Sequence, residues 1–176
     1  ADLKLIQKEV RAELRLLAGQ FQTSQKDRLY LLNEKKIEEL LKTHSSTKER
    51  LEFYPQLKEV ISNLNVKSIL DLGCGINPIA LSSKEIKYFA YDINSLDLDI
   101  VKKFFKKNKI HGEIFQIDLR KTDNLSLPET DLCLMFKILD MIDKKGHKQA
   151  EKIINKVKSN FLLISFSTKT LSGKPM

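Results

Sequence analysis

The stretch LDLGCGINPIAL, from Leu70 to Leu81, decides the fold of this chain. An apolar run contains Asp71, and two glycines, Gly73 and Gly75, follow with one residue between them. A short apolar run that ends in a glycine turn is typical of a buried strand leaving a parallel sheet. Glycines there let the backbone turn tightly and approach a ligand where a Cβ atom would collide. In open α/β sheets, ligands bind beyond the carboxyl ends of the strands. We therefore expect a ligand site at this turn.

The rest of the chain contains four more apolar runs of strand length. The five predicted strands lie within Lys67–Gly73, Tyr88–Ile93, Glu113–Leu119, Thr130–Ile138 and Asn160–Phe166. The runs are apolar throughout rather than alternating, and polar or helical segments separate them, which indicates parallel strands covered on both faces. The pattern predicts an α/β fold with a doubly wound, Rossmann-like sheet.

Acidic residues stand at or just past three of these strands, at Asp71, Asp92 and Asp118. Asp92 follows Gly73 by 19 residues, close to the interval at which a carboxylate reaches a ribose diol. The ligand therefore has an adenosine-like half. Pro78 stands where the dinucleotide fingerprint has its third glycine, which disfavours a nicotinamide oxidoreductase. We expect Asp71 to orient the turn by accepting backbone N–H bonds rather than to do chemistry.

Amphipathic helices are predicted before the first strand. Apolar residues recur at helical spacing from Leu3 to Leu17, and again from Leu29 to Leu41. Ser46 or Thr47 resembles the N-cap of a further helix, whose start Pro55 bends or shifts. His44 precedes this segment and allows two interpretations, a packing role at the helix entry or a contact to RNA.

Charge and composition limit the possible partners. The chain has 176 residues and a net charge of +8, and residues 101–176 carry 16 Lys or Arg against 8 Asp or Glu. Such a balance favours a polyanionic partner, although a solvated lysine-rich surface gives the same numbers. No apolar run has the length of a membrane span. Two distant cysteines form neither a disulfide framework nor a zinc-ligand spacing, so we expect a reducing cytoplasm and no metal.

The segment DLGCGINP resembles motif I of the class I S-adenosylmethionine-dependent methyltransferases. The resemblance implies S-adenosyl-L-methionine as cofactor, with the acidic residue after the second strand on the ribose and a residue pair after the third on the adenine. The cofactor-binding residues implied on these grounds are Gly73, Cys74, Gly75, Asp92, Ile93, Asp118 and Leu119.

The segment HSSTKERL, His44 to Leu51, is similar to an element of the aminoglycoside-resistance 16S ribosomal RNA (guanine-N7) methyltransferases. The likeness continues through LMFKILDMID and SFSTKTLSGK, so it runs from about residue 43 to the end. It implies that Arg50 pairs with the methionine carboxylate of the cofactor, and that Lys137, Ser165 and Phe166 position the substrate. The chain departs from the family pattern at Gly73, where Ala is usual, and on the substrate side at Asp140, Asp143 and Ser167.

The resemblance implies methylation of 16S ribosomal RNA in the 30S subunit at guanine N7 of the decoding site, by a cytoplasmic monomer, with aminoglycoside resistance as the result. Guanine N7 loses no proton on attack, and no His–carboxylate pair offers a general base. A methyltransferase for another RNA or a small molecule, and a non-catalytic cofactor-binding fragment, remain as alternatives. We expect a helical, RNA-contacting or cap region at 1–62 and a methyltransferase domain at 63–176. We also expect that domain to be truncated, without the usual C-terminal hairpin, since the chain starts at Ala1 and only ten residues follow Phe166.

Overall fold

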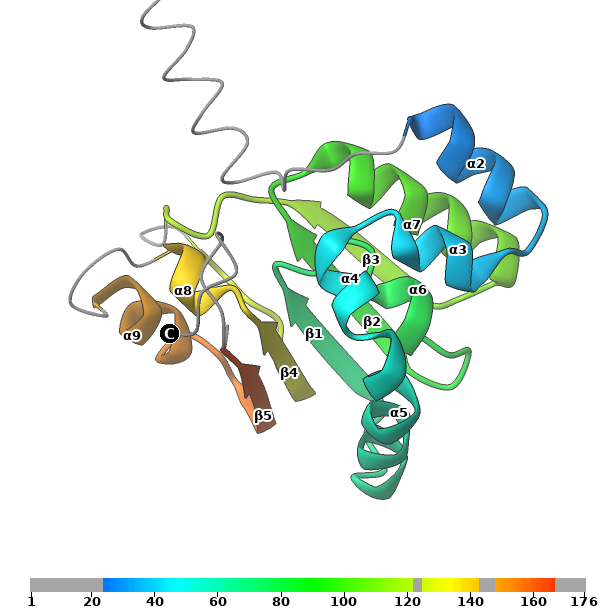
Figure 1. Ribbon diagram of the computed structural model, residues 1–176. Coiled ribbons are helices and arrows are strands. Elements are labelled where there is room, and N and C mark those ends of the chain that lie inside the picture. Colours follow the sequence, from blue (N-terminus) through cyan, green and yellow to red (C-terminus); the bar gives the residue numbers. More distant parts are fainter. Residues whose placement is uncertain (1–23, 122–124, 143–147, 167–176) are drawn as a thin grey trace, which may run out of the picture.

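The computed structural model describes residues 24–121, 125–142 and 148–166. Five strands form one sheet in the order β3-β2-β1-β4-β5, and every neighbouring pair is parallel (Figure 1). The strands are β1 (Ser68–Leu72), β2 (Lys87–Asp92), β3 (Gly112–Gln116), β4 (Thr130–Phe136) and β5 (Ser159–Ser165). This order confirms the predicted doubly wound, Rossmann-like fold and all five strands.

Helices cover both faces of the sheet, and most of them lie on one face. That face carries α2 (Gln25–Asn33), α3 (Ile37–Lys42), α4 (Ser45–Glu49), the 3-10 turn η1 (Leu51–Phe53), α5 (Tyr54–Asn63), α6 (Pro78–Leu81) and α7 (Ser95–Asn108). The other face carries α8 (Leu139–Ile142) and α9 (Lys148–Ile154) (Figure 1).

The two faces hold separate hydrophobic clusters because successive strand residues point in opposite directions. On β1, Ile69 packs with the cluster under α2–α7, whereas Leu70 and Leu72 pack with the cluster under α8 and α9. Asp71 therefore points to the same face as α2–α7, inside the larger cluster. Leu32 of α2 and Leu40 of α3 belong to this cluster, so the helices before the sheet share its core. The predicted division at residue 62 stays a prediction.

The helices before the sheet differ in detail from the prediction. The segment from Leu29 to Leu41 is two helices rather than one, because the chain turns at Lys35 with φ +58°. The predicted N-cap at Ser46 or Thr47 was wrong, since both residues lie within α4 and His44 occupies the cap position. Pro55 stands in the first turn of α5, where proline is tolerated. The predicted helix at Leu3–Leu17 lies outside the described residues.

The edge strands are less buried than the sequence suggested. All of β1 after Ser68 is buried, whereas β3 and β5 are exposed along much of their length. Phe161 and Leu162 of β5 are 43% and 39% exposed. The prediction of complete burial was wrong here, because side chains point to the two faces of the sheet and these faces are open to solvent over much of β3 and β5. None of the described helices is long and apolar enough to span a bilayer.

Candidate functional site

The turn after β1 needs glycine for reasons within the chain itself. Gly73 has φ +70°, and a Cβ there would lie 2.6 Å from Cδ1 of Ile138. Gly75 has φ +50°, and a Cβ there would lie 2.9 Å from Nε2 of His44. The N–H groups of Gly73 and Cys74 donate to the carbonyl of Tyr91 at 2.8 and 3.0 Å, which fixes the turn against the end of β2. Close approach of a ligand to these glycines stays a prediction.

Asp71 orients the turn, though not through backbone groups. Its Oδ2 accepts hydrogen bonds from the Asn77 side-chain amide at 2.8 Å and from the Tyr88 hydroxyl at 2.7 Å. The expected backbone N–H bonds were therefore the wrong partners, because Asp71 points under the turn at the side chain that begins α6. Burial raises the pKa of Asp71, and the two hydrogen bonds oppose that rise. Its position in the core excludes a direct part in substrate chemistry.

Arg50 reaches the same turn from the segment after α4. Its Nη1 donates to Oδ1 of Asn77 at 3.2 Å, and that oxygen also accepts from the Tyr54 hydroxyl at 2.9 Å. The guanidinium lies 4.9 Å from the centroid of the Phe136 ring at the end of β4. Its Nε is buried without a hydrogen-bond partner, and no ion pair joins Arg50 to a carboxylate within the described ranges. A partly buried guanidinium without a carboxylate partner can pair with an anionic group of a ligand.

Asp92 ends β2 beside the turn and is only 9% exposed. The Gly75 N–H donates to its Oδ2 at 2.7 Å and the Asn94 N–H to its Oδ1 at 2.8 Å. Burial raises the pKa of Asp92 to about 6, against the effect of these two hydrogen bonds. Each carboxylate oxygen keeps a second lone pair, so the group is a fixed acceptor that fits a pair of ribose hydroxyls.

The residues after β2 and β3 form the neighbouring part of the site. The Arg120 guanidinium holds the Asp118 carboxylate at 2.8 and 2.9 Å and keeps its pKa below the usual range. Leu119 is 5% exposed and its side chain packs with Leu72 and Tyr91 on the α8–α9 face. A contact from Leu119 to a ligand would therefore have to come from its backbone. Half-buried Ile93 accepts a hydrogen bond from the Gln116 side chain through its carbonyl, at 3.2 Å.

The predicted substrate residues follow β4 and β5. The Lys137 N–H donates to the carbonyl of Ser165 at 2.9 Å, so the structure brings these two residues together. Lys137 has φ +57°, a conformation that costs about 1–2 kcal/mol in a residue with a Cβ. Its ammonium pairs with Glu49 of α4. Phe166 is 59% exposed immediately after β5. Strain at the mouth of the sheet is consistent with a functional position.

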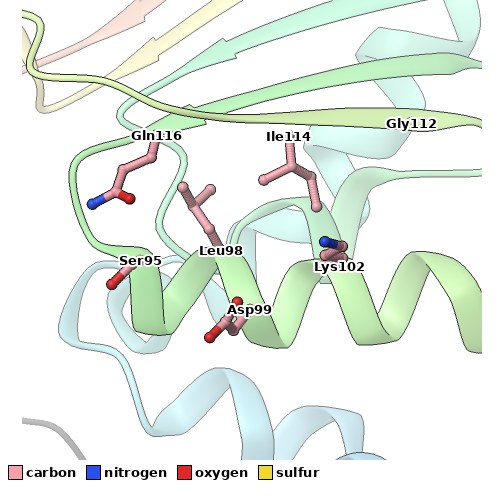
Figure 2. A pocket seen from close by; sticks show the side chains of 7 residues that line it. All are labelled: Ser95, Leu98, Asp99, Lys102, Gly112, Ile114 and Gln116. Atoms are coloured by element: carbon pink, nitrogen blue, oxygen red, sulfur yellow. The ribbon is translucent and has the colours of Figure 1, made fainter.

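A groove of about 300 Å³ lies beside this site rather than in it (Figure 2). It runs between α7 and the edge strand β3 and is lined by Ser95, Leu98, Asp99, Lys102, Gly112, Ile114 and Gln116. None of the predicted cofactor residues lines the groove. We therefore place the candidate site at the turn and the strand ends. No cluster of three metal-ligating side chains occurs in the described part of the chain.

Sequence reasoning missed several residues that hold the site. Asn77 and Tyr54 position Arg50, and Asn94 positions Asp92. Asn77 was visible in the quoted stretch, where an amide after two glycines is a signal for a turn. Tyr54 carries no local signal, because its partner lies 23 residues away in the chain.

Comparison with known proteins shows the family of this chain. The model of the family described as ribosomal RNA methyltransferase (FmrO) matches residues 14–176. The chain belongs to this family. The match includes the helices before β1, which accords with the shared core of α2, α3 and the sheet.

Two curated relatives of the chain are named 16S rRNA (guanine(1405)-N(7))-methyltransferase. The protein from Proteus mirabilis is 30% identical over 145 residues, covering 77% of this chain and 50% of its own length. The protein from Serratia marcescens is 27% identical over 143 residues, covering 78% and 55%. The chain thus spans about half the length of the curated relatives it matches.

Solved structures show the same fold. The 16S rRNA methylase ArmA is 30% identical with a TM-score of 0.62, over 88% of this chain and 81% of that one. The methylase RmtF, solved in complex with S-adenosyl-L-homocysteine, is 24% identical with a TM-score of 0.82, over 97% and 69%. At that identity the likeness to RmtF supports the fold alone.

Proposed function

We propose that this chain binds S-adenosyl-L-methionine and methylates 16S ribosomal RNA, at N7 of a guanine in the decoding site. The observation that carries the proposal is the pair of groups at one turn, the fixed acceptor Asp92 and the guanidinium of Arg50, which has no carboxylate partner in the described ranges and whose Nε has no hydrogen-bond partner. A zwitterionic nucleoside cofactor offers hydroxyls to the first and a carboxylate to the second. The FmrO family match and the names of the relatives support the RNA substrate.

Each predicted residue has a role in this proposal. Asp92 accepts the ribose hydroxyls, Arg50 pairs with the methionine carboxylate, and the residues that follow β2 and β3 surround the adenine. The residues in contact with the cofactor are Arg50, Gly73, Cys74, Gly75, Asp92, Ile93, Asp118 and Leu119. The hydrogen bonds from Tyr54 and Arg50 to Asn77 keep the guanidinium against the turn.

The proposed methyl transfer requires the two reactants to be aligned and does not require a general base. The bound cofactor supplies a methyl group that its sulfonium already activates. Guanine N7 attacks with a free lone pair and loses no proton, so the protein only has to align the nucleophile with the methyl carbon. The structure does bring a histidine to a carboxylate, which the sequence had not indicated, since Nε2 of His44 lies 3.6 Å from Oδ2 of Asp97. His44 is still no candidate base, because this nitrogen packs against Gly75 and Asp97. This packing favours the helix-entry interpretation of His44.

The substrate side is assigned to the ends of β4 and β5. Lys137 carries a positive charge at the mouth of the sheet, suited to a guanine O6 or a phosphate, and Phe166 presents an exposed ring beside it. Ser165 fixes the backbone of Lys137. We further propose that the substrate is RNA within the 30S subunit, that the protein acts as a monomer in the cytoplasm, and that the modification confers aminoglycoside resistance.

Methyl transfer to ribosomal particles tests the proposal. The purified chain is incubated with labelled S-adenosyl-L-methionine and either 30S subunits or protein-free 16S RNA, and the RNA is then cleaved chemically at N7-methylguanosine. Labelling with cleavage at one decoding-site guanine is expected. Lys137→Met should lower the rate of methyl transfer without changing cofactor affinity. Lys84→Met, in the exposed turn before the start of β2 and away from the strand end that carries Asp92, should change neither. Cofactor binding without labelling of either RNA would contradict the substrate and favour another RNA, a small molecule or a non-catalytic role.

A further inference from the structure

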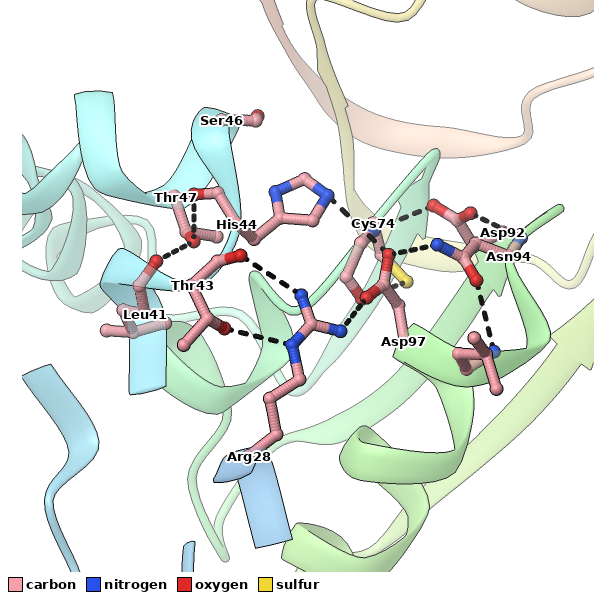
Figure 3. A network of polar contacts seen from close by, with 12 residues as sticks. Arg28, Leu41, Thr43, His44, Ser46, Thr47, Cys74, Asp92, Asn94 and Asp97 are labelled. Carbon is pink, nitrogen blue, oxygen red and sulfur yellow. Dashed lines mark hydrogen bonds and ion pairs between the residues drawn. The ribbon is translucent and has the colours of Figure 1, made fainter. Parts of the chain in front are cut away.

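Arg28 of α2 is an arginine buried inside the fold, with 1% of its surface exposed. Its Nη1 donates to Oδ1 of Asp97 at 2.5 Å, and its other nitrogens donate to the hydroxyl and the carbonyl of Thr43 at 3.0 and 3.3 Å (Figure 3). The pair joins the first described helix to the first turn of α7, across 69 residues of sequence. Burying two charges costs free energy that can equal the attraction between them, so stabilisation alone does not explain this ion pair.

The second oxygen of Asp97 continues the connection. Oδ2 accepts a hydrogen bond from the Asn94 side-chain amide at 2.7 Å. The same asparagine caps α7 through its Oδ1, which accepts from the Leu96 N–H at 3.1 Å. Its own backbone N–H donates to Oδ1 of Asp92 at 2.8 Å. A continuous chain of polar contacts thus runs from Arg28 through Asp97 and Asn94 to the carboxylate of the candidate site.

A second route reaches the other oxygen of Asp92. His44, at the start of α4, lies 3.6 Å from Oδ2 of Asp97 through its Nε2. The same imidazole occupies the space beside Gly75, whose N–H donates to Oδ2 of Asp92 at 2.7 Å. One oxygen of Asp92 thus accepts from the backbone of Asn94 and the other from the backbone of Gly75. Asn94 and His44 both contact Oδ2 of Asp97 (Figure 3).

We propose that Arg28 is a positioning residue for the cofactor, because it holds Asp97 and Asn94 in the arrangement that aims Asp92 at its ligand. The inference rests on the proposed binding of S-adenosyl-L-methionine. It makes formation of the Arg28–Asp97 contact and binding of the cofactor two linked equilibria, each of which favours the other. An element before the sheet then sets the affinity of a site to which it contributes no contact.

The test uses a variant that removes both charges together. Arg28→Met alone leaves Asp97 buried without its partner and endangers folding. The double variant Arg28→Met/Asp97→Asn keeps similar volumes and leaves no unpaired charge. We expect it to retain the folded circular dichroism spectrum and to bind S-adenosyl-L-homocysteine at least about fivefold more weakly by calorimetry. Arg28→Lys, which keeps the charge, should lose less affinity than the double variant.

Two further variants separate positioning from general stability. In an Asp92→Ala background, the Arg28→Met/Asp97→Asn pair should change the affinity less than about twofold, because the residue through which it acts is absent. Lys107→Met provides the matched control. Lys107 donates to the carbonyls of Leu32 and Asn33 at 2.9 and 3.0 Å, so its loss loosens α2 without touching Asp97. We expect a lower melting temperature and an unchanged affinity.

The outcomes distinguish the two proposals. If the wild-type chain does not bind S-adenosyl-L-homocysteine, the proposed cofactor and this inference are both overturned. If the wild type binds and the folded double variant binds equally well, only the inference is overturned. Equal losses in the presence and absence of Asp92, or a loss of affinity in Lys107→Met as large as in the double variant, would also overturn it.

Discussion

Asp92 illustrates how much a single residue depends on its surroundings. The sequence predicted its role from the interval to Gly73, and the structure adds that both of its oxygens accept backbone N–H bonds. Burial and the nearby Asp97 and Asp71 carboxylates raise its pKa, whereas the two hydrogen bonds lower it. The balance leaves a carboxyl group with a pKa of about 6, close to neutrality. Ligand binding and folding should therefore both depend on pH through this residue.

Asp92→Ala should weaken binding of S-adenosyl-L-homocysteine by about 1–3 kcal/mol, because two ribose hydroxyls lose their acceptor. Isothermal titration calorimetry at neutral pH measures the change. Asp99→Ala removes an exposed carboxylate from α7, is the matched control and should bind like the wild type. Wild-type affinity in Asp92→Ala would contradict the assignment of this carboxylate to the ribose.

The raised pKa of Asp92 also predicts a pH dependence of stability. The folded state binds this proton up to about pH 6, whereas the unfolded state releases it near the ordinary value of 3.8. The ionised group therefore lowers the free energy of unfolding as pH rises through that window, by about 3 kcal/mol in total. Urea titrations should show Asp92→Asn gaining stability relative to wild type between about pH 4 and pH 6. A difference that stays constant with pH would contradict the raised pKa.

At the scale of the element, the turn between β1 and α6 combines two constraints. Gly73 adopts a left-handed conformation, and the side chain of Ile138 from the segment after β4 fills the space beside it. The sequence predicted the turn because glycine spacing is a local signal. It did not predict Ile138 as the neighbour, since that contact forms only when β4 pairs with β1.

Gly73→Ala should lower the free energy of unfolding by about 2–4 kcal/mol. The left-handed conformation costs about 1–2 kcal/mol with a Cβ, and overpacking against Ile138 costs about as much again. Chemical denaturation measures the loss. In an Ile138→Ala background the same substitution should cost less, because the two nearest atoms, Cδ1 and Cγ1 of Ile138, are removed. An equal cost in both backgrounds would show that the collision contributes nothing.

Helix boundaries were the weakest part of the prediction from sequence. The segment from Leu29 to Leu41 has a helical apolar spacing throughout, yet Lys35 in a left-handed conformation divides it. The apolar spacing indicated one helix because α2 and α3 bury Leu32 and Leu40 in the same hydrophobic cluster. Thr47 was misassigned as a cap for a similar reason. Its hydroxyl donates to the carbonyls of Leu41 and His44, which no local pattern reveals.

For the whole molecule, the sequence predicted the sheet and its ligand-binding edge but not the connections between distant segments. Continuous apolar runs predict parallel strands, because a strand that is buried on both faces has apolar residues at successive positions of the sequence. The Arg28–Asp97 pair leaves no such pattern, since each residue alone is an ordinary charged residue within a helix. At the edge strands the sequence predicted too much rather than too little. Phe161 and Leu162 are apolar and were predicted to be buried, but both side chains are exposed.

The net charge of +8 predicts the physical character of RNA binding by the whole chain. Contacts from lysines and arginines to phosphates release counterions, so the affinity for 16S RNA should fall at least about tenfold between about 50 and 200 mM salt. Filter binding or fluorescence anisotropy measures this dependence. Affinity for S-adenosyl-L-homocysteine should change far less over the same range. An RNA affinity insensitive to salt would contradict a phosphate-based interface.

The two buried cysteines allow local and global opening of the fold to be measured separately. Burial raises the thiol pKa of both Cys74 and Cys133, so neither offers a reactive thiolate while it is buried in the folded chain. Alkylation must therefore wait for exposure. Cys133 lies in the central strand β4 and needs the sheet to come apart, whereas Cys74 needs only its turn to lift from β2. Iodoacetamide should label Cys74 first, and S-adenosyl-L-homocysteine should slow that labelling much more than the labelling of Cys133.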